Sequence, residues 1–199
     1  MNFNKPDTKL DECIFIAKQI IPADLCDAIV QDIETREWEP HMWYNNVTDT
    51  NRSEETKELD VQSATPELHR VLADFVVEAG KAYYKNYSYP YADQPDRTGQ
   101  FMTQFSPVRF NRYAPGQIMR QHHDHIHSIF DGKSKGVPVL SFIFNFNDDY
   151  EGADLFFWED TVAKLGKGDI IMFPSNWLFP HGVTEATKGV RYSGSVWGW

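Results

Sequence analysis

The sequence contains no long apolar run, and its beginning is polar. No stretch approaches the roughly 18 apolar residues that a membrane-spanning helix needs. Residues 1–12 (MNFNKPDTKLDE) include no apolar segment of the kind found in secretory signal peptides. We therefore expect a cytoplasmic protein that has no membrane partner.

Cysteine and basic residues are also scarce. The chain has two cysteines, Cys13 and Cys26, which are too few for a disulfide framework, so we interpret both as buried thiols. It has 19 Lys and Arg against 29 Asp and Glu, which gives a formal net charge of −10. Because affinity for phosphate comes largely from Lys and Arg, this balance argues against a nucleic-acid partner.

Aromatic residues, in contrast, are abundant. They make up 15% of the 199 residues, which is typical of a chain that packs a core. The length suits a single domain over 1–199, and it leaves the oligomeric state open. We expect a support region of helices and loops over 1–100, followed by a β core over 101–199.

The first half of the chain predicts two helices. One begins at Pro22-Ala-Asp24 and ends near residue 37, with apolar residues at a four-residue step. The other begins at Thr65-Pro66, a typical cap and first helical position, and continues to about residue 86. We expect a short strand over 13–21, a long polar loop or an irregular hairpin over 39–60, and a loop over 87–100.

From residue 101 onward the pattern changes to short β-type runs that are separated by turn residues. The expected strands are 106–113, 118–122, 137–147, 153–158, 169–173, 179–183 and 190–197. Many short strands at this spacing favour a β-sandwich or a β-barrel.

The most unusual segment is Arg120-Gln-His122-His-Asp124-His-Ile-His, which holds four histidines in six residues. Alternate residues of a strand face the same side, so His122 and Asp124 should project together. Two imidazoles and one carboxylate are the ligand set of non-haem iron(II) oxygenases. His181 is the single histidine downstream of this segment, and we expect it to supply the second imidazole. A solvated turn with a chance His-x-Asp is the alternative.

The remaining histidines and one arginine complete the set of candidates. Arg191 follows His181 by ten residues, and its fork could pair both oxygens of the distal carboxylate of 2-oxoglutarate. His125 and His127 could orient the metal ligands or could belong to a loop at the mouth of the cleft. His41 and His69 lie in the helical half, and we interpret them as surface or structural residues.

Residues 101–199 resemble the iron(II)- and 2-oxoglutarate-dependent dioxygenase superfamily, and within it the prolyl 4-hydroxylase-like branch. The matching motifs, in chain order, are Arg112-Tyr113-Ala-Pro-Gly116, His122-x-Asp124, Leu140-Ser-Phe-Ile-Phe-Asn-Phe-Asn147, Tyr150-Glu-Gly-Ala-Asp-Leu-Phe156, Gly168-Asp-Ile-Ile-Met-Phe173, Pro180-His181, Arg191-x-Ser193 and Trp197. The resemblance implies a mainly β fold with packed helices (α+β). Its core would be a double-stranded β-helix, or jelly roll, with the N-terminal helices supporting one sheet.

The resemblance also implies a role for each matching residue. His122, Asp124 and His181 would hold Fe(2+), and Arg191 would bind the distal carboxylate of 2-oxoglutarate. Tyr113 and Ser193 would contact the same cosubstrate, and Trp197 would lie on the substrate side. The implied reaction hydroxylates a prolyl residue in a peptide or protein, consumes O2 and releases succinate and CO2. Ascorbate is left open as a further cofactor.

Some residues depart from the usual pattern of the branch. Collagen-type prolyl hydroxylases usually carry lysine where Arg191 stands, and their Gly-Gly turn is Gly152-Ala153 in this chain. These departures leave the substrate open. The alternatives are a non-prolyl substrate, such as a small molecule or a modified nucleic acid, and a non-catalytic β-helix module that binds a metal or ligand.

Overall fold

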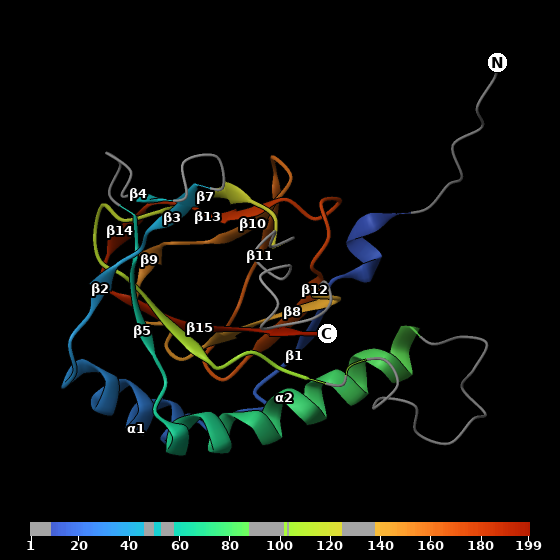
Figure 1. The fold of residues 1–199 in the computed structure, drawn as a ribbon, viewed down its shortest axis with the longest axis horizontal. Helices are drawn as coiled ribbons and strands as arrows, with labels where there is room; N and C mark the ends of the chain where they lie inside the picture. The colour runs from blue at the N-terminus through green and yellow to red at the C-terminus, as the bar shows by residue number, and fades with distance from the viewer. Residues whose placement is uncertain (1–8, 46–49, 53–57, 88–101, 103, 125–137) are drawn as a thin grey trace.

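The structure is a computed structural model that describes residues 9–45, 50–52, 58–87, 102, 104–124 and 138–199. Two antiparallel sheets face each other, and two helices lie along the outer side of the larger one (Figure 1). The larger sheet has the order β1 (Phe15–Ala17), β12 (Ile170–Pro174), β8 (Leu140–Asn145), β15 (Arg191–Gly198), β6 (Arg109–Tyr113), β5 (Asp60–Ser63) and β2 (Glu39–Pro40). The smaller sheet has the order β11 (Thr161–Ala163), β10 (Leu155–Phe157), β13 (His181–Val183) and β7 (Met119–His122).

The remaining elements are short, apart from the helices. They are η1 (Leu10–Cys13), α1 (Ala23–Glu34), α2 (Pro66–Tyr87), the pair β14 (Ala186–Lys188) and β9 (Glu151–Gly152), and the pair β3 (Trp43–Asn45) and β4 (Thr50–Arg52). Among the described residues, no helix is both long enough and apolar enough to cross a membrane. The two antiparallel sheets, with helices along the larger one, confirm the expected mainly β fold in which helices support one sheet.

The core has two layers, and β12 separates them. Ile170 and Met172 pack toward the helices, while Ile171 and Phe173 pack toward the smaller sheet. Both faces of this strand are buried, which explains why its sequence is an unbroken apolar run. The layer between the two sheets is the one that contains the polar pocket described below.

Both predicted helices are present, with small differences at their ends. In α2, the backbone N–H of Leu68 donates to Thr65 Oγ1 over 3.3 Å, so Thr65 caps the helix as expected. Helix α1 ends at Glu34, three residues before the predicted end at residue 37. Neither cysteine is in a disulfide: Cys26 is buried in α1, and Cys13 is half-buried.

The range 39–60, expected to be a long loop or an irregular hairpin, contains a hairpin in which β3 pairs with β4, together with strand residues that were not expected. It contains β2, β3 and β4 and the first residue of β5, and β5 pairs with β6 to extend the larger sheet. Gln62 explains why β5 is missed: its buried amide donates to the backbone oxygens of Ile33 and Glu37, so a polar side chain occupies the core side. The predicted loop over 87–100 lies, from residue 88 onward, outside the described residues.

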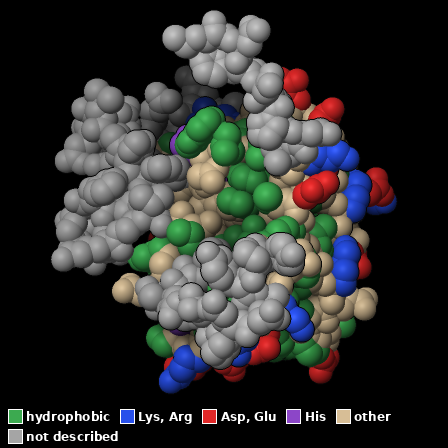
Figure 2. Space-filling view, turned by 90° about the vertical axis from the view of Figure 1, so that its right-hand side faces the viewer, with side chains coloured by type: hydrophobic (Ala, Val, Ile, Leu, Met, Phe, Trp, Pro, Cys, Tyr) green, Lys and Arg blue, Asp and Glu red, His purple; other side chains and the backbone are tan. Residues whose placement is uncertain are grey.

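Charged side chains of both signs lie next to one another on the face drawn in Figure 2. Figure 2 shows Asp, Glu, Lys and Arg side chains interspersed along one margin of the molecule, with hydrophobic side chains nearer the middle of that face. The net charge of −10 therefore does not form a single acidic patch on this face.

Candidate active site

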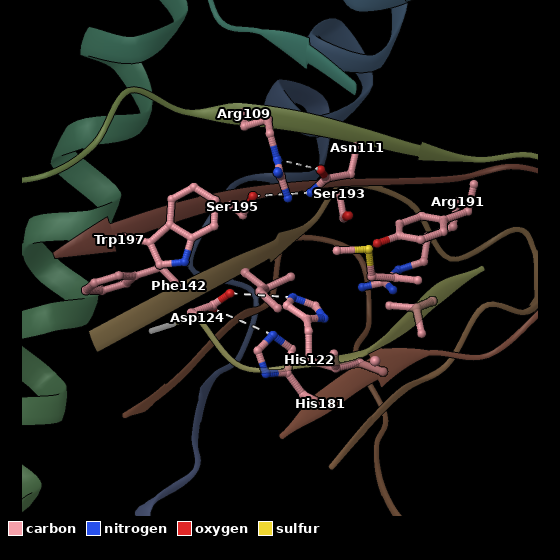
Figure 3. Close-up of a pocket in the computed structure, with 16 residues that line it drawn as sticks. Arg109, Asn111, His122, Asp124, Phe142, His181, Arg191, Ser193, Ser195 and Trp197 are labelled. Atoms are coloured by element: carbon pink, nitrogen blue, oxygen red, sulfur yellow. Dashed lines mark hydrogen bonds and ion pairs between the residues drawn. The ribbon is translucent and has the colours of Figure 1, made fainter. Parts of the chain in front are cut away.

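A pocket lies between the two sheets, and alternate residues of β6 and β15 line one side of it. Strands β6 and β15 supply one wall, and β7 and β13 supply the other (Figure 3). The lining side chains that can form hydrogen bonds or carry charge are Arg109, Asn111, Tyr113, His122, Asp124, His181, Arg191, Ser193, Ser195 and Trp197. The pocket thus joins a histidine-carboxylate cluster to two arginines.

Three of these side chains converge on one point. Strand β13 pairs with β7, which places His181 opposite His122. The distance from Asp124 Oδ1 to His122 Nε2 is 3.5 Å, and that from Asp124 Oδ2 to His181 Nε2 is 3.6 Å. One ligand atom from each residue lies within 4.8 Å of the other two. Asp124 follows the end of β7, so the turn after the strand, and not strand alternation, brings it beside His122.

Backbone carbonyls orient both imidazoles. The Nδ1 atom of His122 lies 2.8 Å from the oxygen of Arg120, and that of His181 lies 3.0 Å from the oxygen of Phe179. These contacts suit rings that are protonated on Nδ1, which leaves the Nε2 lone pairs facing Asp124. Two imidazole nitrogens and a carboxylate directed at one point match the ligand set of a non-haem iron(II) site.

The charge states of the cluster also suit metal binding. Burial alone would raise the pKa of Asp124, but His181, His122 and a hydrogen bond from Ser141 Oγ (2.7 Å) lower it well below its usual range. Burial lowers the pKa of His181 to about 4, although Asp124 opposes this shift. At neutral pH the cluster therefore offers an ionised carboxylate and a neutral imidazole, the forms that bind metals.

Aromatic rings surround the histidines. The ring of His181 lies 4.7 Å from that of Phe173 and 5.8 Å from that of Phe157. The ring of Trp43, in β3, meets His122 edge-on at 5.5 Å. These apolar contacts restrict the motion of the imidazoles and keep water from the sides of the cluster.

Arg191 lies in the same pocket and is 1% exposed. Its Nε donates to Asn145 Oδ1 over 2.9 Å, and its Nη1 donates to the oxygen of Ala153 over 3.1 Å. The guanidinium lies 5.5 Å from the ring of Tyr113, which is its partner across the β15–β6 pair. The burial of Tyr113 raises the pKa of its phenol, so its hydroxyl stays protonated and able to donate a hydrogen bond.

Comparison with known families adds an independent observation. A family model described as the 2OG-Fe(II) oxygenase superfamily matches residues 108–199, the segment that carries every polar residue of the pocket. This segment, just under half of the chain, is similar to the 2OG-Fe(II) oxygenase superfamily.

Curated proteins similar to this chain include PKHD-type hydroxylases. A PKHD-type hydroxylase from Shewanella sp. (strain MR-7) is 33% identical over 99 residues, which are 47% of this chain and 43% of the relative. One from Phenylobacterium zucineum (strain HLK1) is 36% identical over 98 residues, which are 46% of this chain and 42% of the relative. The match therefore spans less than half the length of these relatives.

Solved structures share the fold over nearly the whole chain. A prolyl-4-hydroxylase from Pseudomonas putida has a TM-score of 0.60 and 17% identity, and the match covers 94% of this chain and 91% of that one. A prolyl hydroxylase from Trichoplax adhaerens, solved with a hypoxia inducible factor peptide fragment, has a TM-score of 0.66 and 12% identity over 94% and 83%. At these identities, the likeness establishes the fold.

All seven site residues expected from the sequence line this pocket. They are His122, Asp124, His181, Arg191, Tyr113, Ser193 and Trp197. The structure brings them together, and their ligand roles stay predictions. Of the neighbouring histidines, His123 is exposed, and His125 and His127 lie outside the described residues.

The pocket also contains residues that were not predicted from the sequence. Arg109, Asn111 and Ser195 share a strand face with residues that were predicted, so strand alternation could have identified them. His41, left as a surface or structural residue, is buried with its ring 4.9 Å from that of Trp43. No sequence signal indicated that the segment carrying these two rings would lie against His122.

Proposed function

We propose that the chain is an iron(II)- and 2-oxoglutarate-dependent dioxygenase that hydroxylates a prolyl residue in a peptide or protein. One observation carries the proposal: two imidazoles and a carboxylate converge between a buried arginine and a tryptophan, in a segment similar to the oxygenase superfamily. The reaction would convert a substrate C–H bond, O2 and 2-oxoglutarate into the C–OH product, succinate and CO2.

The metal site would consist of His122, Asp124 and His181. Bound iron(II) would supply the redox chemistry with O2, which no protein side chain can supply. Ser141 holds the carboxylate of Asp124 in place and itself contacts Ser175 Oγ over 2.8 Å. The backbone oxygens of Arg120 and Phe179 hold the two rings, so the ligand atoms are oriented before a metal binds.

The cosubstrate would occupy the Arg191 end of the pocket. Nε and Nη1 of Arg191 already donate to protein oxygens, so the guanidinium is fixed in place. Its third nitrogen, Nη2, has no hydrogen-bond partner among the described residues and can bind a ligand. Nη2 would pair with the distal carboxylate of 2-oxoglutarate, and the hydroxyls of Tyr113 and Ser193 would donate to it as well. The burial of this end excludes water and strengthens the ion pair.

The substrate would approach from the Trp197 end, where the indole forms one wall of the pocket. A flat aromatic wall suits the apolar ring of proline. The fold neighbours named as prolyl hydroxylases support a prolyl substrate, and the neighbour solved with a peptide fragment supports a peptide or protein. Ascorbate stays a prediction that the assay below can test by its omission.

The first prediction concerns turnover. Purified protein with iron(II), 2-oxoglutarate and a panel of proline peptides should form succinate and a hydroxylated peptide, detected by mass spectrometry. Asp124→Ala should lower turnover by about 1,000-fold or more, because the remaining two imidazoles hold the metal poorly. Asp74→Ala, which removes an exposed carboxylate from α2, is the matched control and should keep full turnover.

Metal content gives a second readout of the same site. The wild-type protein should retain about one iron per chain after anaerobic loading, and Asp124→Ala should retain far less. Full turnover by Asp124→Ala would refute the metal assignment. If the protein turned over modified oligonucleotides or small molecules but none of the proline peptides, the prolyl substrate would be refuted. The metal assignment would still stand.

A further inference from the structure

A second guanidinium faces the pocket at its substrate end. Arg109 lies in β6, four residues before Tyr113, and Ser195 stands opposite it in β15. Four residues of strand separate positions by about 13 Å, so Arg109 is distant from the end where Arg191 lies. Figure 3 shows Arg109 above Trp197 and Arg191 at the other side of the pocket.

The Arg109 side chain is held in position. Its Nε donates to Asn111 Oδ1 over 3.1 Å, and the guanidinium lies 5.2 Å from the centre of the Trp197 ring. Asn111 in turn donates from Nδ2 to Ser195 Oγ over 3.4 Å. These contacts fix the plane of the guanidinium but leave its two terminal nitrogens without a hydrogen-bond partner among the described residues.

The pairing of the other arginines makes this arrangement unusual. Of the six arginines whose side chains the structure describes, four pair with a carboxylate: Arg36 with Asp32, Arg70 with Glu67, Arg112 with Asp60, and Arg120 with Glu58. The two without a carboxylate partner among the described residues are Arg109 and Arg191, and both line the pocket. Arg191 is the residue proposed above to receive a carboxylate of the cosubstrate.

Partial burial makes it costly that Arg109 has no anion partner among the described residues. Burial lowers the pKa of the guanidinium, and Tyr113 and Asp124 only partly offset the shift. An arginine nevertheless stays protonated, so this end of the pocket holds a partly desolvated cation that has no anion partner among the described residues. Two free nitrogens of a fixed fork match the two oxygens of a carboxylate better than the single oxygen of an amide.

We propose that Arg109 is a substrate-positioning residue that binds a carboxylate of the substrate close to the proline. This inference rests on the proposed function and names the substrate class within it. The carboxylate could be the C-terminal group of a chain that ends in proline, or the side chain of an adjacent Asp or Glu. Both present the same two oxygens to Arg109 while the proline ring packs on Trp197.

Binding measurements distinguish the two sources. Full-length protein with iron(II) and 2-oxoglutarate, kept anaerobic, is titrated by calorimetry with two pairs of peptides. One pair is Gly-Ala-Pro with a free carboxylate or a C-terminal amide, and the other is acetyl-Glu-Pro-Ala-amide or its Gln analogue. In at least one pair the carboxylate form should bind about tenfold tighter or more, as expected for a charge-assisted bidentate pair.

Variants assign the preference to Arg109. Arg109→Gln should remove the difference in affinity between the carboxylate peptide and its neutral analogue, while Arg109→Lys should keep part of that difference. Arg112→Gln is the matched control, because Arg112 lies in the same strand but pairs with Asp60 away from the pocket, and it should keep the full preference. The KM for 2-oxoglutarate should not change in Arg109→Gln, which separates this role from that of Arg191.

Several outcomes would overturn the inference. If the wild-type protein bound each carboxylate peptide no more tightly than its neutral analogue, the inference would be wrong. This result needs no variant, so it holds even if Arg109→Gln failed to fold. A preference that persists in Arg109→Gln, or a large rise in its KM for 2-oxoglutarate, would do so as well. Absence of turnover with every peptide would refute the proposed function, whereas carboxylate binding that depends on Arg109 would still stand.

Discussion

Arg191 is the bulkiest of the fully buried side chains in the described part of the chain. Its bonds to Asn145 and Ala153 hold it in place before any ligand arrives, so the cost of ordering it is met by folding and not by binding. Lysine has a single ammonium on a flexible stem and cannot make both of these bonds while reaching a carboxylate.

We predict that Arg191→Lys raises the KM for 2-oxoglutarate about tenfold or more, with a smaller change in kcat at saturating cosubstrate. Succinate formation at increasing 2-oxoglutarate concentrations measures both constants. Arg36→Lys, two residues beyond the end of α1, is the control and should keep the wild-type KM. An unchanged KM in Arg191→Lys would remove this residue from cosubstrate binding.

Some of the site residues could be predicted from the sequence, and one could not. His122, Asp124, His181 and Arg191 could be predicted because their chemistry is rare and their spacing is specific. Arg109 could not be, because its significance depends on which arginines have partners, and pairing is visible only in three dimensions.

At the scale of elements, the pairing of β13 with β7 positions the two imidazoles. Gly182 lies between His181 and Val183, where the register of the pair shifts. A Cβ atom at this position would come within 2.8 Å of the backbone oxygen of Met119 and 2.7 Å of Phe156 Cζ. Only glycine allows β13 to approach β7 this closely.

Gly182→Ala should therefore push β13 away from β7 and move His181 from Asp124. We expect the free energy of unfolding to fall by about 1–3 kcal/mol and the affinity for metal to fall about tenfold or more. Urea denaturation and anaerobic titration with iron(II) measure the two effects. Gly166→Ala is the control, since a Cβ there meets only Asp169 at an ordinary 3.6 Å. Wild-type metal affinity in Gly182→Ala would contradict this account.

The elements that sequence reasoning found are those whose local pattern matches their surroundings. Strand β12 is an apolar run because both of its faces are buried, and α2 carries its own N-cap. Strand β5 was missed because Gln62 and Asp60 form hydrogen bonds across the fold, to α1 and to Arg112, so its composition resembles a loop. Short pairs such as β9 with β14 depend on distant partners and have no local signal.

At the scale of the whole molecule, protonation of buried histidines should couple stability to pH. His41 is 7% exposed, and its Nδ1 is buried without a hydrogen-bond partner among the described residues. Burial lowers its pKa to about 4, and the nearby charges of Arg109 in β6, with His122 and Arg120 in β7, add to the shift. In the unfolded chain the pKa of a histidine is about 6.5.

The sign of the effect follows from these two pKa values. Between pH 6.5 and pH 4 the unfolded chain binds a proton at His41 that the folded chain does not, so the free energy of unfolding falls as the pH falls. We predict a loss of about 3 kcal/mol from this residue over that range. The variant His41→Phe keeps a ring beside Trp43 but cannot bind the proton, so its free energy of unfolding should fall by that much less over the same pH range. Urea denaturation of both proteins from pH 7.5 to pH 4, with a chelator present, measures the difference. The difference in unfolding free energy between the two proteins at pH 7.5 measures the effect of the substitution on packing alone. If the free energies of unfolding of the two proteins fell in parallel as the pH is lowered, His41 would have the same pKa in the folded and unfolded chain, and the prediction would be wrong.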